Sequence, residues 1–296
     1  MGISWCSGQV ARSGLWEPPL PPRAQHVVSR VVLERFAAGA PPRVGQWDRS
    51  RPGPPKWELF RARSVGTVEW FVPPADALAV EAVWGQVESR LPEALAVLDR
   101  GGVVNAGSRV EETLQDCLAV HWARSKAVRA VHATMLSQAR SELRGQLDAL
   151  PEEVLDQVSA ELYGLVVEGP VARADVLDQA VVGSSALGFG ERVVAYFRRA
   201  RDRNRTARLE VYDCSPGSPD LVISDCPVLS RNHHGTALNP RQGSGLGAEV
   251  GMPLGPRVAV CLRATGPRRR PIGSADVQQL NAMQEQVAER YLYRRP

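Results

Sequence analysis

The chain of 296 residues contains five cysteines, and their number and spacing exclude two classes of protein. No two of them form a Cys-x-x-Cys pair, so no zinc-binding signature is present, and an odd number cannot complete a disulfide framework. Free thiols in a reducing cytoplasm explain the set most simply, and we expect no disulfide-linked partner. The five are Cys6, Cys117, Cys214, Cys226 and Cys261.

Long apolar runs are also missing. No run approaches the roughly 20 residues needed to cross a bilayer. The first residues lack the basic start and apolar core of a secretory signal. We therefore expect no membrane association and a cytoplasmic location.

Lysine is nearly absent, since Lys56 and Lys126 are the two lysines among 36 basic residues. Together with abundant alanine, valine, glycine and proline, this bias is typical of coding in a high-GC bacterium such as an actinobacterium. The net charge of +4 and the pI near 9.0 are mild and do not by themselves indicate nucleic-acid binding. The basic run from Arg198 to Arg208 has few interleaved aromatics, so we interpret it as a solvated helix end.

The hydrophobic pattern that is present predicts an α+β fold. Residues 1–22 lack periodicity and end in a proline cluster, so we expect a disordered leader followed by a single domain over residues 24–296. Pro92 should split or kink the first long helix. Helical periodicity covers 27–36, 76–100, 108–124, 126–150, 151–167, 174–201 and 274–291. Alternation or buried apolar runs predict strands at 43–48, 65–72, 207–212, 221–223 and 258–262. A helical middle region should therefore pack against a small, mainly antiparallel sheet built from N- and C-terminal strands.

The run Leu221–Ile223 ends in Ser224 and Asp225, with Pro227 shortly after. A carboxylate at the end of a buried strand is costly unless it is paired or accepts backbone N–H bonds. In a structural role, Asp225 would cap the turn with help from Ser224. In a functional role, it would present a carboxylate at a strand end, where polar groups of binding sites are often placed.

Two helices carry further candidate residues. Glu81 and Glu88 lie seven residues apart and flank Trp84 on one helix face. The two carboxylates could form an acid–base or metal site, or they could be the solvated border of the helix. His121 and Arg124 border a buried stripe, where an arginine needs a carboxylate partner. Glu88 and Asp225 are the candidate partners of Arg124, in a structural ion pair or an anion-binding site.

Histidines elsewhere are weaker indicators. His26 precedes a short amphipathic helix, either as a capping or packing residue or as a site residue. His233 and His234 follow Asn232 in a glycine-containing loop, which we interpret as exposed. The glycines of that loop lack the following helix and lysine of a phosphate-binding loop.

Six short motifs follow one another along the chain, from Gln25–Arg30 through His121–Ser125 and Ile223–Pro227 to Leu280-Asn281. Their order and spacing resemble a bacterial family catalogued as domain of unknown function 4238, over about residues 24–296. The resemblance implies a cytoplasmic bacterial protein and carries no activity with it. That family usually has Asn or His between the Asp and Pro of its Ser-Asp-x-Pro motif, and this chain has Cys226 there. The motifs are Gln25-His26-Val27-Val28-Ser29-Arg30, Val87-Glu88-Ser89, His121-Trp122-Ala123-Arg124-Ser125, Ile223-Ser224-Asp225-Cys226-Pro227, Met252-Pro253-Leu254-Gly255-Pro256 and Leu280-Asn281.

These observations support two hypotheses. In the first, the chain is a hydrolase-like enzyme or an anion or ligand binder. His26, Glu88 and Asp225 would do the acid–base chemistry, and Arg124, His121 and Ser224 would bind the ligand. No motif indicates a cofactor, although His26 with a carboxylate could hold a divalent metal. In the second, the chain is a non-enzymatic regulatory or interaction protein, and the same residues are structural pairs. The partner remains unidentified under either hypothesis.

Overall fold

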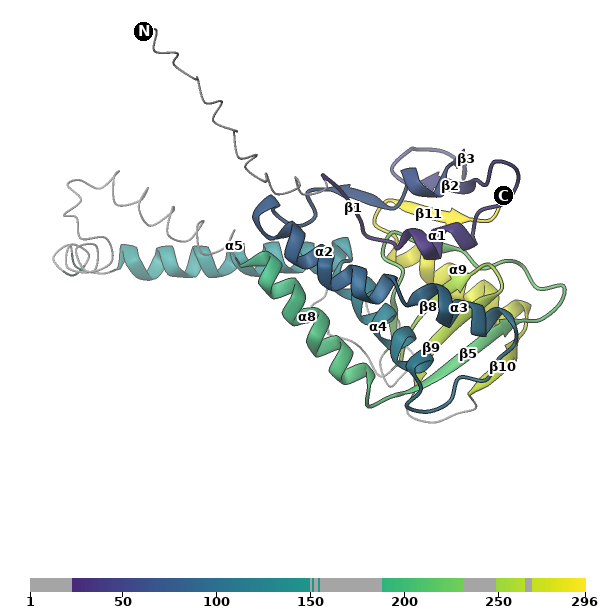
Figure 1. Cartoon of the computed structure of the whole chain (residues 1–296). Coiled ribbons are helices and arrows are strands. Elements are labelled where there is room, and N and C mark those ends of the chain that lie inside the picture. The colour runs from purple at the N-terminus through teal and green to yellow at the C-terminus, as the bar shows by residue number, and fades with distance from the viewer. Residues whose placement is uncertain (1–22, 150, 152–153, 155–187, 232–248, 264–267) are drawn as a thin grey trace, which may run out of the picture.

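The computed structural model describes residues 23–149, 151, 154, 188–231, 249–263 and 268–296 (Figure 1). Helices and mainly antiparallel sheets combine in this part of the chain, so the predicted α+β class is confirmed. The helices are α1 (Arg30–Arg35), α2 (Pro74–Glu88), α3 (Leu91–Asp99), α4 (Arg109–Ala123), α5 (Lys126–Asp148), α8 (Phe189–Asn204) and α9 (Ser274–Val287), with a 3-10 turn η1 (Ala62–Ser64). The leader 1–22, most of the helix predicted over 151–167, and the loop of Asn232, His233 and His234 lie outside the described residues.

The strands divide among three sheets rather than one. A five-stranded sheet has the order β10-β5-β9-β8-β7 and is antiparallel except for the β10–β5 pair. A four-stranded antiparallel sheet has the order β3-β2-β11-β6, and β1 pairs with β4 in a third. The strands are β1 (Ala24–His26), β2 (Val44–Asp48), β3 (Trp57–Phe60), β4 (Thr67–Glu69), β5 (Arg208–Cys214), β6 (Ile223–Ser224), β7 (Leu229–Arg231), β8 (Glu249–Gly255), β9 (Val258–Arg263), β10 (Arg269–Ile272) and β11 (Tyr291–Arg294).

The four-stranded sheet joins the two ends of the chain, as predicted, but through a strand that the sequence analysis did not predict. The terminal helix α9 ends at Val287 rather than near Tyr291. Residues Tyr291–Arg294 form β11, which lies between β2 and β6. Leu292 and Tyr293 are both buried there. Tyrosine and leucine in alternation suit a strand between two neighbours, and that environment outweighs the helical period upstream.

The helix predicted over 27–36 is shorter than expected. Residues Ala24–His26 form β1, and α1 begins only at Arg30, after Ser29. The backbone N–H groups of Val27 and Val28 both donate to the carbonyl of Gly66, so they are held at the β1–β4 pair. Gly66 has a φ of 71°, and a Cβ there would lie 2.6 Å from the Leu33 side chain, so this close approach requires glycine.

Pro92 divides the helical region as predicted. Helix α2 ends at Glu88, and α3 begins at Leu91 with Pro92 in its first turn, where no backbone hydrogen bond is lost. Helices α2, α4 and α8 then pack together, while α5 projects from the body of the molecule (Figure 1).

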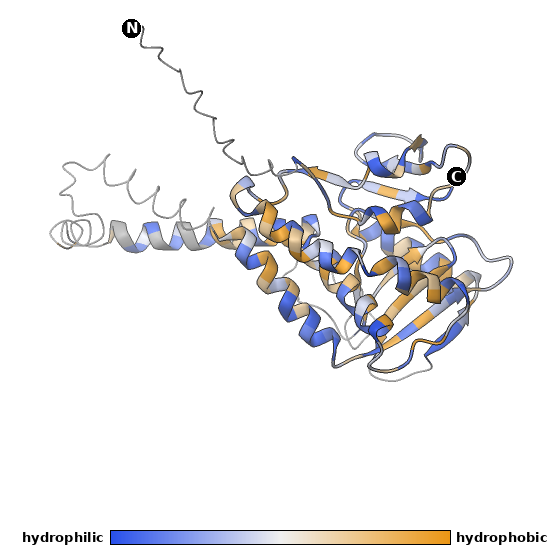
Figure 2. Cartoon of the chain, viewed as in Figure 1, coloured by the Kyte–Doolittle hydropathy of each residue, from blue (hydrophilic) through white to orange (hydrophobic). Residues whose placement is uncertain are grey.

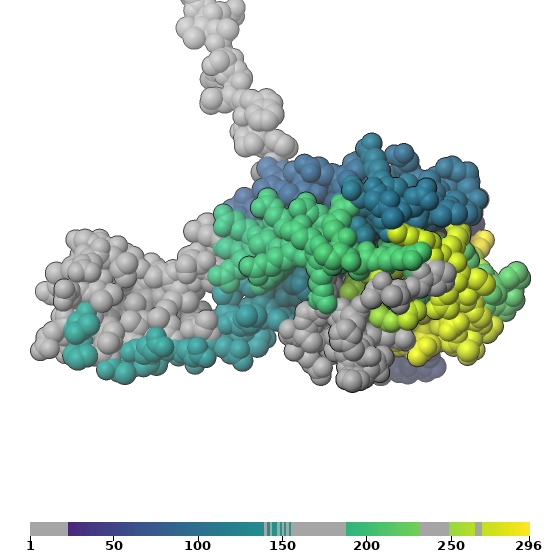
Figure 3. All heavy atoms as spheres, turned by 90° about the horizontal axis from the view of Figure 1, so that it is seen from below, coloured from purple at the N-terminus to yellow at the C-terminus, as the bar shows by residue number. Residues whose placement is uncertain are grey.

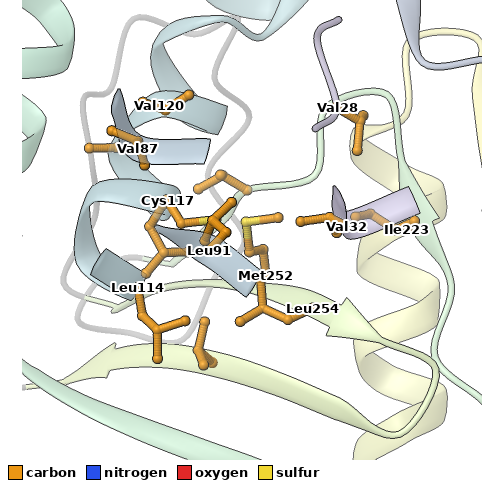
Figure 4. Close-up of a cluster of buried hydrophobic side chains, with 14 of the residues drawn as sticks. Val28, Val32, Val87, Leu91, Leu114, Cys117, Val120, Ile223, Met252 and Leu254 are labelled. Carbon is orange, nitrogen blue, oxygen red and sulfur yellow. The ribbon is translucent and has the colours of Figure 1, made fainter. Parts of the chain in front are cut away.

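The main hydrophobic core lies between these helices and the five-stranded sheet. Its side chains include residues of α1, α2, α3, α4 and α8 and of β5, β6, β8 and β9. Figure 4 shows Val87, Cys117 and Met252 among them. Apolar residues gather on the strands and on the inner faces of the helices (Figure 2). Segments from both ends of the chain therefore share one core. Among the described helices, none combines the length and the apolar character needed to cross a bilayer.

Candidate functional site

Arg124 is a buried positive charge at the C-terminal cap of α4, with an exposed fraction of 1%. Its Nη1 donates to Glu88 Oε1 at 2.6 Å, which confirms one of the two predicted partners. Its guanidinium carbon also lies 5.7 Å from the centre of the Trp84 ring. A buried guanidinium without such partners would be costly, so Glu88 and Trp84 make its position tenable.

His121 fixes the orientation of Arg124 from one turn earlier in α4. Its Nδ1 faces the carbonyl of Cys117 at 2.8 Å. Its Nε2 accepts from the backbone N–H of Ser29 at 3.0 Å and from Arg124 Nη2 at 2.9 Å. Because both neighbours of Nε2 are donors, the imidazole is neutral and its proton sits on Nδ1. Burial, and then the charge of Arg124, lower the pKa of His121 well below its usual value. Both ring nitrogens are thus occupied within the protein, and His121 positions Arg124 and Ser29.

Helix α2 presents Glu81, Trp84 and Glu88 toward Arg124 because these positions share one helix face. Glu81 Oε1 and Trp84 Nε1 are buried and have no hydrogen-bond partner in the described part of the chain. Burial raises the pKa of Glu81, an effect that Arg124 opposes and Glu88 reinforces. Glu81 therefore keeps its proton to a higher pH than an ordinary carboxyl group.

His26 ends β1 and is close enough to Arg124 and Glu88 for their charges to affect its pKa. Its Nε2 is buried and makes no hydrogen bond to a described residue. Burial lowers the pKa of His26, Arg124 lowers it further, and Glu88 acts in the opposite direction. The imidazole is therefore neutral near pH 7.

We call these residues the Arg124 cluster: His26, Ser29, Glu81, Trp84, Glu88, His121 and Arg124. The described residues contain eight buried side-chain nitrogen or oxygen atoms without a partner, and five of them belong to this cluster. Arg124, Trp84 and Ser29 are buried, whereas His26, Glu81 and Glu88 are partly exposed, so the cluster reaches the protein surface. The five atoms are His26 Nε2, Ser29 Oγ, Glu81 Oε1, Trp84 Nε1 and Arg124 Nε.

Asp225 and Ser224 have partners of their own, away from Arg124. Asp225 is buried and accepts from Lys126 Nζ at 3.1 Å and from the backbone N–H groups of Glu289 and Arg290 at 2.9 and 3.2 Å. Burial raises the pKa of Asp225, and Lys126 opposes the rise. Asp225 therefore pairs with Lys126 and not with Arg124. The side chains of Arg124 and Lys126, on either side of the α4–α5 junction, pair with different carboxylates.

Ser224 completes the same turn. Its Oγ accepts from the backbone N–H of Cys226 at 3.3 Å, and its own N–H donates to Gln284 Oε1 at 2.9 Å. Gln284 Nε2 in turn donates to the carbonyl of Pro227 at 2.7 Å. The hydrogen-bond partners of Ser224 and Asp225 thus come from the chain itself. This geometry matches the structural role, in which Asp225 caps the turn with help from Ser224.

Of the predicted site residues, the structure brings together His26, Glu88, His121 and Arg124. Sequence reasoning noticed Glu81 and Trp84 through their spacing from Glu88 but did not select them. Ser29 gave no signal, because its role depends on a contact with His121, 92 residues away. Among the described residues, no group of three or more His, Cys, Asp or Glu side chains is arranged to hold a metal ion.

A surface groove of about 370 Å³ lies elsewhere, lined by Arg35, Asp99, Asp213, Arg257 and Arg269 among others. Arg35 pairs with Asp99, and Arg269 pairs with Asp213. Arg257 donates to the carbonyls that surround it. These polar groups satisfy one another within the fold, so the groove is a weaker candidate for a site than the Arg124 cluster.

The comparisons with known proteins agree with the extent of the resemblance seen in the sequence. Residues 24–296 match the model of a family described as Protein of unknown function (DUF4238). No curated protein and no solved structure matches the chain. The description of the family assigns no activity, so any function has to be argued from the residues of the Arg124 cluster.

Proposed function

The chain belongs to the DUF4238 family of proteins of unknown function, and we propose that it binds a small polar molecule at the Arg124 cluster and acts on it in a hydrolase-like reaction. The observation that carries this proposal is a group of five buried polar atoms, one of them Nε of Arg124, that make no hydrogen bond to any residue the structure describes. Leaving a buried polar atom unsatisfied costs about 1–3 kcal/mol, so five in one place favour a ligand that supplies the missing partners.

The charge balance of the cluster favours an uncharged ligand over an anion. The charge of Arg124 is offset by Glu88 at 2.6 Å, and its Nη2 is engaged with His121. Nε of Arg124 and Nε1 of Trp84 make no hydrogen bond to a described residue, so both can donate to a ligand. The idea that Arg124 holds an anionic group therefore loses support. Two free donors next to the acceptors of Glu81 and His26 suit an amide-like group that both accepts and donates hydrogen bonds.

The pKa values of His26 and Glu81 are shifted in the directions that an acid–base pair needs. The pKa of His26 is lowered and that of Glu81 is raised, so a neutral base and a protonated acid can coexist. In the proposed hydrolysis, His26 Nε2 takes a proton from water as the water oxygen bonds to the acyl carbon. Glu81 then gives its proton to the leaving amine or alcohol as its bond to carbon breaks.

The structural alternative applies to the other half of the predicted site. The complete hydrogen bonding of Asp225 and Ser224 supports a role in holding β6, β11 and the start of α5 together. We further propose a bacterial protein of the reducing cytoplasm. The free thiols of Cys117, Cys214, Cys226 and Cys261 support that location.

The test is thermal unfolding and calorimetric titration with a panel of small amides and esters, with inorganic phosphate as the anionic comparison. Some amide or ester should stabilise the parent protein and bind it, and Glu81→Gln should lose that effect. Glu93→Gln, an exposed change in α3, should respond as the parent does. Equal stabilisation of the Glu81→Gln variant, or a response to phosphate alone, would overturn the proposal.

A further inference from the structure

The positive charge of the chain is concentrated in residues 191–208. This segment contains seven arginines and two acids, a net charge of +5, whereas the whole chain carries +4. The remaining residues therefore sum to −1. A mild overall charge conceals one strongly basic segment, which comprises α8 and the first residue of β5.

Helix α8 buries one face and exposes arginines on the others. Val193 and Phe197 pack into the core, while Arg192, Arg198 and Arg199 are exposed. Arg192 and Arg199 are two turns apart, so they lie on one face at about 10 Å along the axis. The C-terminal end of α8 is hydrophilic in Figure 2, and the helix lies on the molecular face seen in Figure 3.

Carboxylates within the described part of the chain neutralise other arginines of this segment. Arg205 pairs with Asp116 at 2.9 Å, and Arg201 pairs with Asp202 at 3.2 Å. No acidic side chain that the structure describes pairs with Arg192, or with the two adjacent arginines of the next turns. The charges of these three exposed guanidinium groups are therefore not neutralised by any described residue. They can pair with an external anion without breaking an ion pair within the described part of the protein.

The surroundings of these arginines indicate which polyanion fits. Insertion into a lipid surface needs exposed apolar side chains, and α8 presents no large exposed hydrophobic residue. Stacking on single-stranded bases needs free aromatic rings, but Phe197 is buried and Tyr196 packs against Trp122 and His132. Guanidinium groups donate two parallel bonds to phosphate oxygens. We infer that α8 docks, without reading sequence, on the phosphodiester backbone of a nucleic-acid duplex.

The test is fluorescence anisotropy with short labelled DNA and RNA duplexes at several salt concentrations. Three arginine–phosphate contacts predict a slope of about −2.7 for log K against log salt, which lowers affinity about 40-fold between about 50 and 200 mM. The double variant Arg198→Glu, Arg199→Glu should bind at least about tenfold more weakly and reduce the slope to about −0.9.

The control is Arg61→Glu with Arg63→Glu, which makes the same charge change at two exposed residues near η1. This control should bind the duplex as the parent does. Both double variants should keep the parent's circular dichroism spectrum, because all four side chains are exposed. Equal loss in the two variants, no binding by the parent at low salt, or binding to anionic vesicles and not to a duplex would each overturn the inference. None of these outcomes depends on the Arg124 cluster.

Discussion

At the scale of single residues, Arg124 and Glu88 show how an ion pair can be unequal. The side chain of Arg124 is 2% exposed, whereas that of Glu88 is 29% exposed. Water can therefore reach the carboxylate if its partner is removed, but cannot reach the guanidinium. Glu88 is therefore essential for stabilising the buried charge of Arg124, whereas water can partly replace Arg124 in stabilising the charge of Glu88.

This asymmetry predicts that Glu88→Gln destabilises the protein more than Arg124→Met does. The first change leaves a buried guanidinium unpaired and should cost about 3–5 kcal/mol. The second leaves a carboxylate within reach of water and should cost about 1–3 kcal/mol. Urea unfolding measures both free energies, and equal losses or the reverse order would contradict the argument.

The buried histidines predict a loss of stability on mild acidification. The pKa values of His26, His121 and His132 are lowered in the folded protein, mainly by burial. The unfolded chain takes up protons near pH 6.5 while the folded state resists them. Stability is therefore full above pH 6.5 and falls as the pH drops below it, by up to about 1.4 kcal/mol per pH unit for the fully buried His121 and by less for His26 and His132, which are less deeply buried.

His121 should contribute most to this slope, because its pKa lies furthest below the ordinary value. Unfolding free energies of the parent and of His121→Asn, measured from about pH 7.5 to 5, should show a shallower decline in the variant. The comparison uses the slope, so a uniform loss of stability in the variant does not affect it. Parallel pH profiles would show that His121 does not titrate in this way.

At the scale of elements, the junction between α4 and α5 places two positive charges, Arg124 and Lys126, beside two different carboxylates. Arg124 ends α4 and turns to Glu88 of α2, and Lys126 begins α5 and turns to Asp225. Ser125, between them, accepts a hydrogen bond from the first turn of α5. One short connection therefore ties the helical region both to the Arg124 cluster and to the turn after β6.

The start of α4 gives a prediction at this scale. Ser108 caps the helix by accepting from the backbone N–H of Glu111 at 3.2 Å. Ser108→Ala should cost about 1 kcal/mol and speed hydrogen exchange in the first turn of α4. Ser89→Ala, an exposed change at the end of α2, should alter stability by about 0.5 kcal/mol or less. Identical losses would mean that the cap contributes nothing.

At the scale of the whole molecule, β11 joins the N-terminal strands to the C-terminal half. It pairs with β2 on one side and with β6 on the other. Arg290, just before it, donates to Asp48 of β2 at 2.8 Å. The last strand therefore links parts of the chain more than 200 residues apart.

Removal of residues 291–296 should therefore unfold the protein or leave it without cooperative unfolding. The deletion exposes the edges of β2 and β6 and removes the buried Leu292 and Tyr293. Removal of only Arg295 and Pro296, which are exposed, should leave the thermal unfolding curve unchanged. Circular dichroism melting measures both, and a cooperative melt of the longer deletion would contradict the role of β11.

Local patterns were sufficient for much of the fold. The hydrophobic period located α2, α3, α4 and β9, Pro92 marked the break between two helices, and the burial of Arg124 required a carboxylate, which Glu88 supplies. The same patterns did not predict the strand Tyr291–Arg294, because four residues directly after a helix are too few for a periodic pattern to identify a strand.

The sequence alone determined the class of the fold, the helix break at Pro92 and the need of Arg124 for a carboxylate partner, because these follow from short-range sterics and from the cost of an unpaired charge. Only the tertiary structure decided that Asp225 pairs with Lys126 and that Ser29, Glu81 and Trp84 join His26 around Arg124. Those choices depend on which distant segments meet. These contacts join residues that are 36 to 99 positions apart in the sequence, so no local spacing predicts them.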